Sequence, residues 1–195
     1  QSAFAAFDLQ EVNDPGAVEG LLNALEHKFL PTRINGLDGL EKRKLIPESL
    51  QNLNMTPYCN LRVRILVEIP AVWFPAARKL RGIWQHLLSG RPIDELGLSY
   101  TPGRRELVND FWESTRGEAP WNIELANQIT GHDRMWAESY TLLKAGQRNR
   151  WAVDAIGRLG LNHEREAMVQ LKQATASMRD PDWHKTLGRT LAALS

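Results

Sequence analysis

The chain of 195 residues is long enough for one large domain or two small ones, and its 43% hydrophobic content predicts a folded protein with a packed core. Because 24 Lys and Arg residues face 23 Asp and Glu residues, the overall charge gives no reason to expect a nucleic acid or an anionic membrane as partner. The single cysteine, Cys59, excludes an intrachain disulfide and a metal cluster built from several cysteines of one chain. No run of about eighteen apolar residues occurs, so we expect no membrane span.

Three helices with their own start and stop signals are predicted in the first part of the chain. They cover residues 14–30, 74–90 and 101–117, and each begins at a turn that contains proline. Between the first two, residues 31–56 contain "NGLDGL" and Pro47. Glycine and proline are typical of turns, so this segment is predicted to be a long irregular connection with one short helix.

Residues 61–69, "LRVRILVEI", fit two structures. Alternation of apolar, mostly β-branched residues with charged ones favours a strand. The same segment also fits a helical face that begins at Pro57, but Pro70 would then kink the helix at a cost of about 3 kcal/mol. We therefore favour the strand, which needs a partner strand near residues 7–12 or from another chain.

The remainder of the chain is predicted to contain repeated helix pairs. Trp121, Trp151 and Trp183 recur at nearly equal intervals, and each begins an apolar pattern of helical period. "AIGRLG" at 155–160 also aligns with "TLGRTL" at 186–191 when position 155 is set against position 186. Repetition at intervals of about thirty residues, as here, is typical of stacked helix pairs.

Partner helices are predicted between these segments. They cover residues 132–146, with Asp133 as N-cap, and residues 162–178. The last helix is predicted to begin with Asp180 as N-cap and Pro181 in its first turn.

The segment "RNRWAVDAIGRLGLNHEREAMVQLKQATASMRDPDWHKTLGRTLAAL" resembles the HEAT and HEAT-like repeats, in which antiparallel helix pairs stack into a superhelix. The resemblance covers residues 132–195 and, at its widest, 118–195. It implies a mainly α fold, with a short HEAT-like α-solenoid over 118–195 that is capped or extended by a divergent helical part, 1–117, within one continuous domain. Trp151 and Trp183 stand where this family more often has small or aliphatic residues. We expect Trp151 to be a core wedge between neighbouring helix pairs.

The sequence contains no nucleophile elbow, phosphate loop or dinucleotide fingerprint, and its five histidines form none of the usual zinc motifs. "NHERE" at 162–166 holds one His-Glu pair. Some HEAT-like hydroxylases bind two irons through such pairs on successive repeats, but one pair cannot supply the several ligands of a dinuclear site. We therefore expect no catalytic residues, no metal and no cofactor.

The resemblance implies a non-catalytic scaffold or adaptor for a protein partner, acting alone or as one domain of a longer chain. Arginines, aromatic residues and turns coincide in two places, and the partner-binding candidates there are Arg104, Arg105, Trp112, Arg148 and Arg150.

Two other functions stay open. HEAT-like DNA glycosylases hold a duplex on a concave basic face, which implies nucleic-acid binding along an edge formed by the same arginines. The second alternative is an enzyme whose pocket the sequence does not mark. Arginines on a solvated helix face are nonetheless the commonest explanation of such clusters. We expect a cytoplasmic protein of undefined oligomeric state, although the first residue, Gln1, also fits an exported mature chain or an excised domain.

Overall fold

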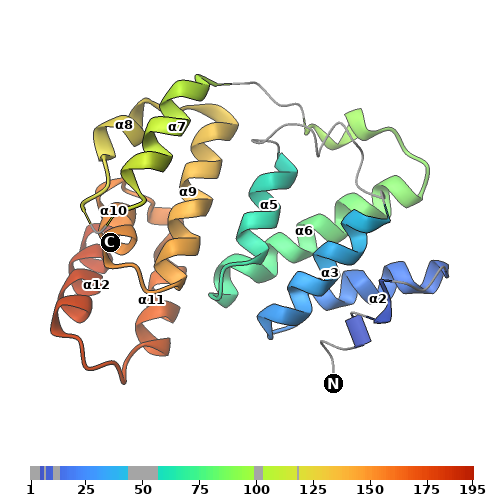
Figure 1. Cartoon of the computed structure of the whole chain (residues 1–195), viewed down its shortest axis with the longest axis horizontal. Coiled ribbons are helices and arrows are strands. Elements are labelled where there is room, and N and C mark those ends of the chain that lie inside the picture. The colour runs from blue at the N-terminus through green and yellow to red at the C-terminus, as the bar shows by residue number, and fades with distance from the viewer. Residues whose placement is uncertain (1–4, 7, 11–13, 44–56, 99–102, 118) are drawn as a thin grey trace. The chain divides into compact units, whose positions relative to one another are not determined.

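The computed structural model describes residues 5–6, 8–10, 14–43, 57–98, 103–117 and 119–195, and all regular structure within these ranges is helical (Figure 1). The prediction of a mainly α fold is therefore confirmed. Within the same ranges, no helix combines the length and the apolar content that a membrane span requires. The chain divides into two compact units, of which the first contains residues 1–66 and 73–100 and the second contains residues 67–72 and 101–195.

Unit 1 is built from four helices and one short 3-10 turn in its described part. These are α2 (Pro15–Leu25), α3 (Leu30–Lys42), α5 (Pro57–Ile65), α6 (Pro70–Leu88), of which residues 73–88 belong to the unit, and η1 (Ile93–Leu96). Their buried leucines form one core together with Trp84, which is 2% exposed. The helix predicted over 14–30 begins as expected, because the Asp14 side chain accepts a hydrogen bond from the Gly16 backbone N–H, but it ends at Leu25.

Helix α3 occupies residues that were predicted to be an irregular connection, and that prediction is wrong for residues 31–42. The glycines of "NGLDGL" lie inside α3, where they face α2. A Cβ added to Gly36 would lie 2.9 Å from the Leu21 carbonyl oxygen, and one on Gly39 would lie 2.6 Å from a Leu21 methyl carbon. These glycines thus allow two helices to pack closely, and do not break the chain. The rest of the predicted connection, residues 44–56, lies outside the described residues.

The predicted strand at 61–69 is also wrong. Helix α5 ends at Ile65, and Pro70 is the first residue of α6, so the proline ring interrupts no helix there. Tyr58, Leu61 and Ile65 are buried, and their spacing of three and four residues places them on one face of α5. The alternative prediction, a helix that begins at Pro57, was therefore closer to the structure. Instead of one helix kinked at Pro70, the segment contains the end of α5 and the start of α6.

Unit 2 consists of the segment 67–72 and a series of helices. The helices are α7 (Arg105–Ser114), α8 (Ile123–Gln128), α9 (Gly131–Gly146), α10 (Arg150–Arg158), α11 (Arg165–Ala174) and α12 (Pro181–Ala193), with the 3-10 turn η2 (Asn162–Glu164) before α11. Short connections join α9 to α10 and α11 to α12 as hairpins, and α10 lies beside α12 (Figure 1).

Besides residues 67–72, unit 2 contains α7 together with the helices that follow it, so the two units divide the chain near residue 100. The reason is an aromatic cluster that joins α7 to the helices after it. The Phe111 ring packs edge-on against Trp121, with 5.8 Å between the ring centroids, and Trp121 stacks on Tyr140 of α9 at 6.1 Å. Burial of these rings fixes α7 in unit 2.

Helices α10 and α12 begin with the same kind of cap. The Asn149 side chain accepts a hydrogen bond of 3.0 Å from the Ala152 backbone N–H, and the Asp180 side chain accepts one of 3.0 Å from Trp183. The predicted cap at Asp180 is thereby confirmed. The predicted cap at Asp133 is wrong, because α9 begins after Thr130 and Asp133 is buried in its first turn.

The three tryptophans do not occupy equivalent positions. Trp121 precedes α8, Trp151 is the second residue of α10 and Trp183 is the third residue of α12. Since successive helical residues are about 100° apart, a shift of one position turns a side chain to another face. Trp121 and Trp183 are buried, whereas Trp151 is only half-buried. The prediction that Trp151 is a core wedge is therefore wrong.

Candidate functional site

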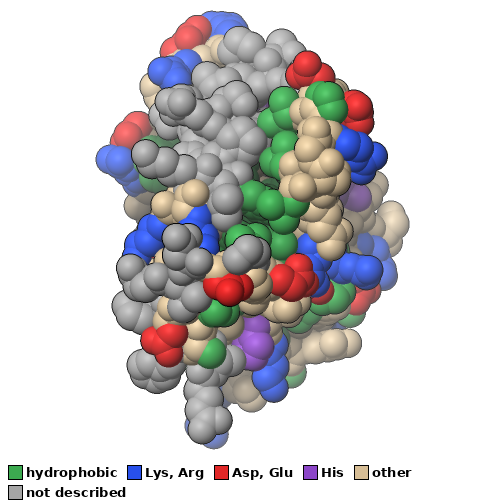
Figure 2. All heavy atoms as spheres, turned by 90° about the vertical axis from the view of Figure 1, so that its right-hand side faces the viewer, with side chains coloured by type: hydrophobic (Ala, Val, Ile, Leu, Met, Phe, Trp, Pro, Cys, Tyr) green, Lys and Arg blue, Asp and Glu red, His purple; other side chains and the backbone are tan. Residues whose placement is uncertain are grey.

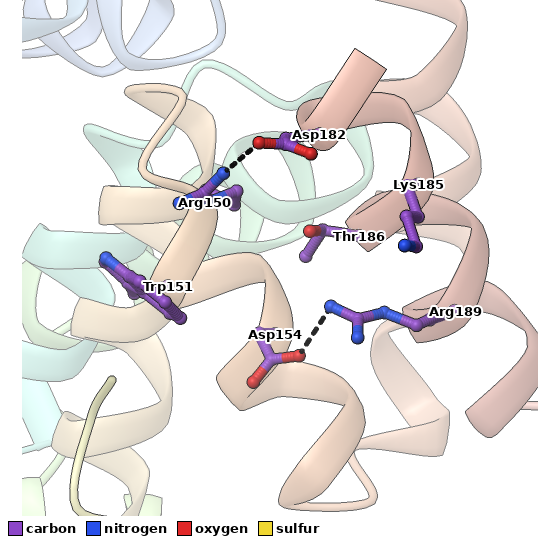
Figure 3. Close-up of a pocket in the computed structure, with 7 residues that line it drawn as sticks. All are labelled: Arg150, Trp151, Asp154, Asp182, Lys185, Thr186 and Arg189. Carbon is purple, nitrogen blue, oxygen red and sulfur yellow. Dashed lines mark hydrogen bonds and ion pairs between the residues drawn. The ribbon is translucent and has the colours of Figure 1, made fainter. Parts of the chain in front are cut away.

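A shallow pocket of about 150 Å³ lies between α10 and α12 in unit 2 (Figure 3). It combines charged, hydroxyl and aromatic side chains from both helices. The lining residues are Arg150, Trp151 and Asp154 from α10, and Asp182, Lys185, Thr186 and Arg189 from α12.

Close backbone packing positions the two walls of the pocket. A Cβ added to Gly157 on α10 would lie 3.1 Å from the Thr190 Cα on α12. The Thr190 hydroxyl donates a hydrogen bond of 2.9 Å to the Val153 carbonyl oxygen. These contacts hold α10 and α12 side by side, so residues in their first turns face each other across the pocket.

Two ion pairs cross the pocket between the helices. The Arg150 Nη1 lies 2.9 Å from the Asp182 Oδ2, and the Arg189 Nη2 lies 3.5 Å from the Asp154 Oδ1. Residue number increases along both helices from the first pair to the second, so α10 and α12 run parallel. Both pairs are partly exposed, and such pairs contribute only about 0–1 kcal/mol to stability. A ligand can therefore rearrange them at low cost.

Trp151 forms the aromatic side of the pocket (Figure 3). The Arg150 guanidinium lies 5.0 Å from the centroid of its ring, which is a cation–π distance. Because the indole is only half-buried, part of its ring remains accessible to a binding partner.

Comparisons with protein-family models, curated proteins and solved structures find no match to this chain. Of the five residues that the sequence analysis selected, one, Arg150, lines the pocket.

Arg104 and Arg105 lie elsewhere, in exposed positions at the start of α7. The Arg104 Nε donates a hydrogen bond of 3.1 Å to the Glu106 carboxylate. A backbone N–H and this Arg104 side chain hold the pKa of Glu106 below its ordinary value. The preceding residue, Gly103, lies against Asp133 in the first turn of α9, which places these arginines near the beginning of that helix.

Arg148 follows the last turn of α9 and is exposed. Because α9 has 16 residues, its two ends are about 24 Å apart at about 1.5 Å per residue. The first turns of α7 and α10 thus lie near opposite ends of α9. The four candidate arginines therefore form two separate groups. Among the described residues, they do not form the single basic edge that the sequence predicted.

Trp112 belongs mainly to the core of unit 2. Its ring centroid lies 4.7 Å from that of Tyr140 and 5.8 Å from that of Trp136. The exposed part of the half-buried indole is flanked by the Arg116 guanidinium, 6.0 Å from the ring centroid. Trp112 therefore holds α7 against α9. It is not one of the residues that line the pocket.

No group of three or more His, Cys, Asp or Glu side chains among the described residues is arranged to hold a metal ion. In the sequence "NHERE", the His163 Nε2 lies 3.5 Å from the Glu164 carboxylate and 4.0 Å from that of Glu138. Arg134 pairs with Glu138 at 2.8 Å, so that carboxylate already has a cationic partner.

Large hydrophobic side chains are exposed in other places, among them Phe29, Phe74 and Leu88 of unit 1. Figure 2 shows a face of the molecule on which hydrophobic side chains gather between charged ones. Single exposed apolar side chains are ordinary on protein surfaces, and nothing on this face indicates what would cover them. The α10/α12 pocket is the stronger candidate, because it combines an aromatic ring with charges from two helices.

Six of the pocket residues were not predicted as site residues from the sequence, namely Trp151, Asp154, Asp182, Lys185, Thr186 and Arg189. The signal that could have found them is the alignment of position 155 with position 186, which also sets Trp151 against Asp182 and places both in the second position of their helices. Equivalent positions of neighbouring parallel helices lie next to each other, so this alignment brings these residues together. The interval between Trp151 and Trp183 is one residue longer than the interval between positions 155 and 186. Aligning the tryptophans therefore does not set Trp151 against Asp182.

Proposed function

We propose that this chain is a non-catalytic helical domain that binds a protein partner at the α10/α12 pocket, acting as a scaffold or adaptor by itself or within a longer protein. The observation that carries the proposal is the half-buried Trp151 beside two inter-helix ion pairs. Tryptophan and arginine are the residues that most often supply binding energy at protein interfaces. Elsewhere in unit 2 the tryptophans are used mainly for packing, as in Trp121 and Trp183.

The size of the pocket favours a protein partner over a small-molecule substrate. Sites for small molecules usually enclose about 300–1,000 Å³. The volume here is about 150 Å³, which suits a side chain that a partner inserts. An enzyme therefore has less support than a binding domain.

The charges also favour a protein over a nucleic acid. Phosphate backbones are bound by rows of Lys and Arg whose charges are not already compensated. Here Arg150 and Arg189 each pair with an aspartate, and Arg104 lies near the other end of α9. Nucleic-acid binding is therefore the second candidate function, and the experiments below test it.

The matching caps of α10 and α12 support the further proposal that the C-terminal hairpins are HEAT-like repeats. Parallel packing of corresponding helices from successive units is what such a stack requires. A cytoplasmic location is part of the same proposal, and a chain whose single cysteine forms no intrachain disulfide is compatible with it.

Site-specific photo-crosslinking tests the proposed function. A photoreactive phenylalanine derivative replaces Trp151 in one variant and Met135, which is exposed on α9, in a control variant. Illumination in an extract of the source cells is expected to link one protein to the Trp151 position and not to the Met135 position. The adduct is then identified by mass spectrometry.

The identified protein is next purified and its affinity measured by calorimetry. Because an aromatic hot spot contributes about 2 kcal/mol or more, we expect Trp151→Ala to weaken binding by a factor of about thirty. The proposal fails if the Trp151 variant gives no adduct above the control. It also fails if Trp151→Ala binds the purified protein as tightly as the wild type does.

A further inference from the structure

The α10/α12 pocket has one more positive than negative charge. Its cations are Arg150, Lys185 and Arg189, and its carboxylates are Asp154 and Asp182. Each carboxylate already pairs with an arginine, at 2.9 Å for Arg150–Asp182 and 3.5 Å for Arg189–Asp154. Lys185 is exposed and forms no hydrogen bond or ion pair with any residue that the structure describes, and no dashed line reaches it in Figure 3. The uncompensated charge of the pocket is therefore the Lys185 ammonium group.

Lys185 lies between the two ion pairs on α12. Asp182, Lys185 and Arg189 follow at intervals of three and four residues, so their side chains share one face of the helix. An arginine has five N–H donors, and Arg150 uses its Nη1 for Asp182. An acceptor that binds Lys185 can thus also accept hydrogen bonds from a flanking arginine without breaking an ion pair.

We infer that the pocket binds an Asp or Glu side chain of the partner protein, whose carboxylate pairs with Lys185 while a neighbouring apolar or aromatic side chain packs on Trp151. This inference rests on the proposed function and adds the chemistry of the partner segment. The pocket of about 150 Å³ has room for a single side chain. The half-buried Trp151 offers apolar surface on the α10 side of the pocket, and Lys185 lies on the α12 side, with Thr186 between them in Figure 3.

A basic partner side chain fits the pocket less well. It would meet Lys185, a like charge, and would have to displace an arginine from Asp154 or Asp182 to find a carboxylate. Juxtaposed like charges are strongly unfavourable at an interface. An acidic side chain meets neither obstacle.

Selection from a library of random peptides displayed on phage tests the inference. The full chain is the target, and the variant Lys185→Glu is used for counter-selection. We expect the selected peptides to carry Asp or Glu close to an aromatic or large apolar residue. Circular dichroism of the variant verifies its fold, which should be intact because Lys185 is exposed.

Affinities of the selected peptides are measured by fluorescence anisotropy. Lys185→Glu is expected to weaken binding about tenfold or more, because it replaces an attractive charge with a repulsive one. The matched control is Lys172→Glu, at an exposed lysine of α11, which should change the affinity by a factor of about two or less.

A charge exchange gives the sharpest result. Replacing the acidic residue of the peptide with Lys should weaken its binding to the wild type and restore its binding to Lys185→Glu. Peptides that need Trp151 but contain no acidic residue, or that bind Lys185→Glu unchanged, overturn the inference and leave the proposed function standing. If no peptide that depends on Trp151 is selected, the proposed function fails too. A single-stranded DNA oligonucleotide that binds the wild type and not Lys185→Glu assigns the pocket to nucleic acid and overturns both.

Discussion

Gly157 on α10 faces the backbone of Thr190 on α12 so closely that a Cβ added to the glycine would lie 3.1 Å from the Thr190 Cα. The same threonine donates a hydrogen bond to the Val153 carbonyl oxygen at 2.9 Å. Together these contacts set the separation of the two helices that form the pocket. The glycine of "AIGRLG" is therefore a packing residue.

The first prediction compares this glycine with Gly188, its counterpart in "TLGRTL". Gly157→Ala should lower the free energy of unfolding by about 1–2 kcal/mol, because the added methyl group pushes against the Thr190 backbone. Gly188→Ala should raise it by about 0.5–1 kcal/mol, because Gly188 lies inside α12 with open space around it and alanine favours the helix. Urea denaturation followed by circular dichroism measures both. A gain in stability for both variants would show that α10 and α12 do not pack as described.

Local signals were enough to predict some elements from the sequence. Asp180 and Pro181 mark the start of α12 by chemistry that lies within one helical turn, and the structure has that cap. Asp14 marks α2 in the same way. Helical content and helix starts of this kind follow from nearby residues alone.

Other elements could not be predicted, because the same residue types act differently in different surroundings. Gly36 and Gly39 resemble chain breakers until Leu21 of α2 is placed against them. Pro70 argues against a helix only if the preceding helix continues to it, whereas α5 ends at Ile65. Tertiary packing decides these cases. The contacts between residues far apart in the chain cannot be derived from the local pattern of one sequence.

The pocket was predicted only in part for a similar reason. Arg150 was selected because arginines and a tryptophan coincide, which is a local feature. Lys185 carries the uncompensated charge only because both aspartates of the pocket are already paired. Asp182 pairs with Arg150 of α10, and Asp154 pairs with Arg189 of α12. Pairing across helices depends on their register, and a shift by one residue changes every pair.

The second prediction concerns Arg148, which has a φ of 66°. This left-handed conformation costs a residue with a Cβ about 1–2 kcal/mol, and glycine adopts it freely. Arg148→Gly should therefore raise the free energy of unfolding by about 1 kcal/mol, as measured by urea denaturation. Arg148→Ala keeps a Cβ and serves as the control, with no comparable gain expected. Equal effects of the two variants would mean that the arginine side chain, and not the backbone, accounts for the change.

The third prediction concerns Arg33, whose side chain is fully buried in unit 1. Its Nε donates a hydrogen bond of 2.8 Å to the Ile65 carbonyl oxygen, and its Nη1 donates bonds of 3.0 Å to the carbonyl oxygens of His27 and Lys28. The guanidinium also lies 4.5 Å from the centroid of the Trp73 ring. One planar group thus connects the end of α5, the turn before α3 and an aromatic ring.

Lysine cannot reproduce this arrangement, because it presents one compact ammonium group in place of a planar set of donors. Arg33→Lys should therefore lower the free energy of unfolding by about 2–3 kcal/mol, since buried carbonyl oxygens lose their donors. Arg78→Lys provides the control, at an exposed arginine 5.8 Å from the Phe74 ring, and should stay within about 0.5 kcal/mol. If both variants unfold at the same urea concentration, the hydrogen bonds of Arg33 contribute little to the stability of unit 1.

The last prediction follows from Tyr58, a buried residue whose hydroxyl donates a hydrogen bond of 2.6 Å to the Glu41 carboxylate. Burial and this hydrogen bond raise the pKa of Tyr58 well above its ordinary value. The folded chain therefore keeps the proton at a pH where the unfolded chain loses it. The stabilisation is fully present below pH about 10 and is lost as the pH rises further, at about 1.4 kcal/mol per pH unit.

Tyr58→Phe removes this titration and leaves Glu41 paired with Arg62, whose Nε lies 2.8 Å from the carboxylate. At neutral pH the variant should be less stable than the wild type by about 1 kcal/mol, the usual contribution of one hydrogen bond. Above pH about 10 the difference should shrink and then reverse, because the wild type alone must keep a tyrosine protonated at this position. Free energies of unfolding measured between neutral and alkaline pH test this, with other titrating groups common to both proteins. Parallel pH curves would mean that Tyr58 ionises in the folded chain as readily as in the unfolded one, and that its bond to Glu41 does not hold α5 against α3.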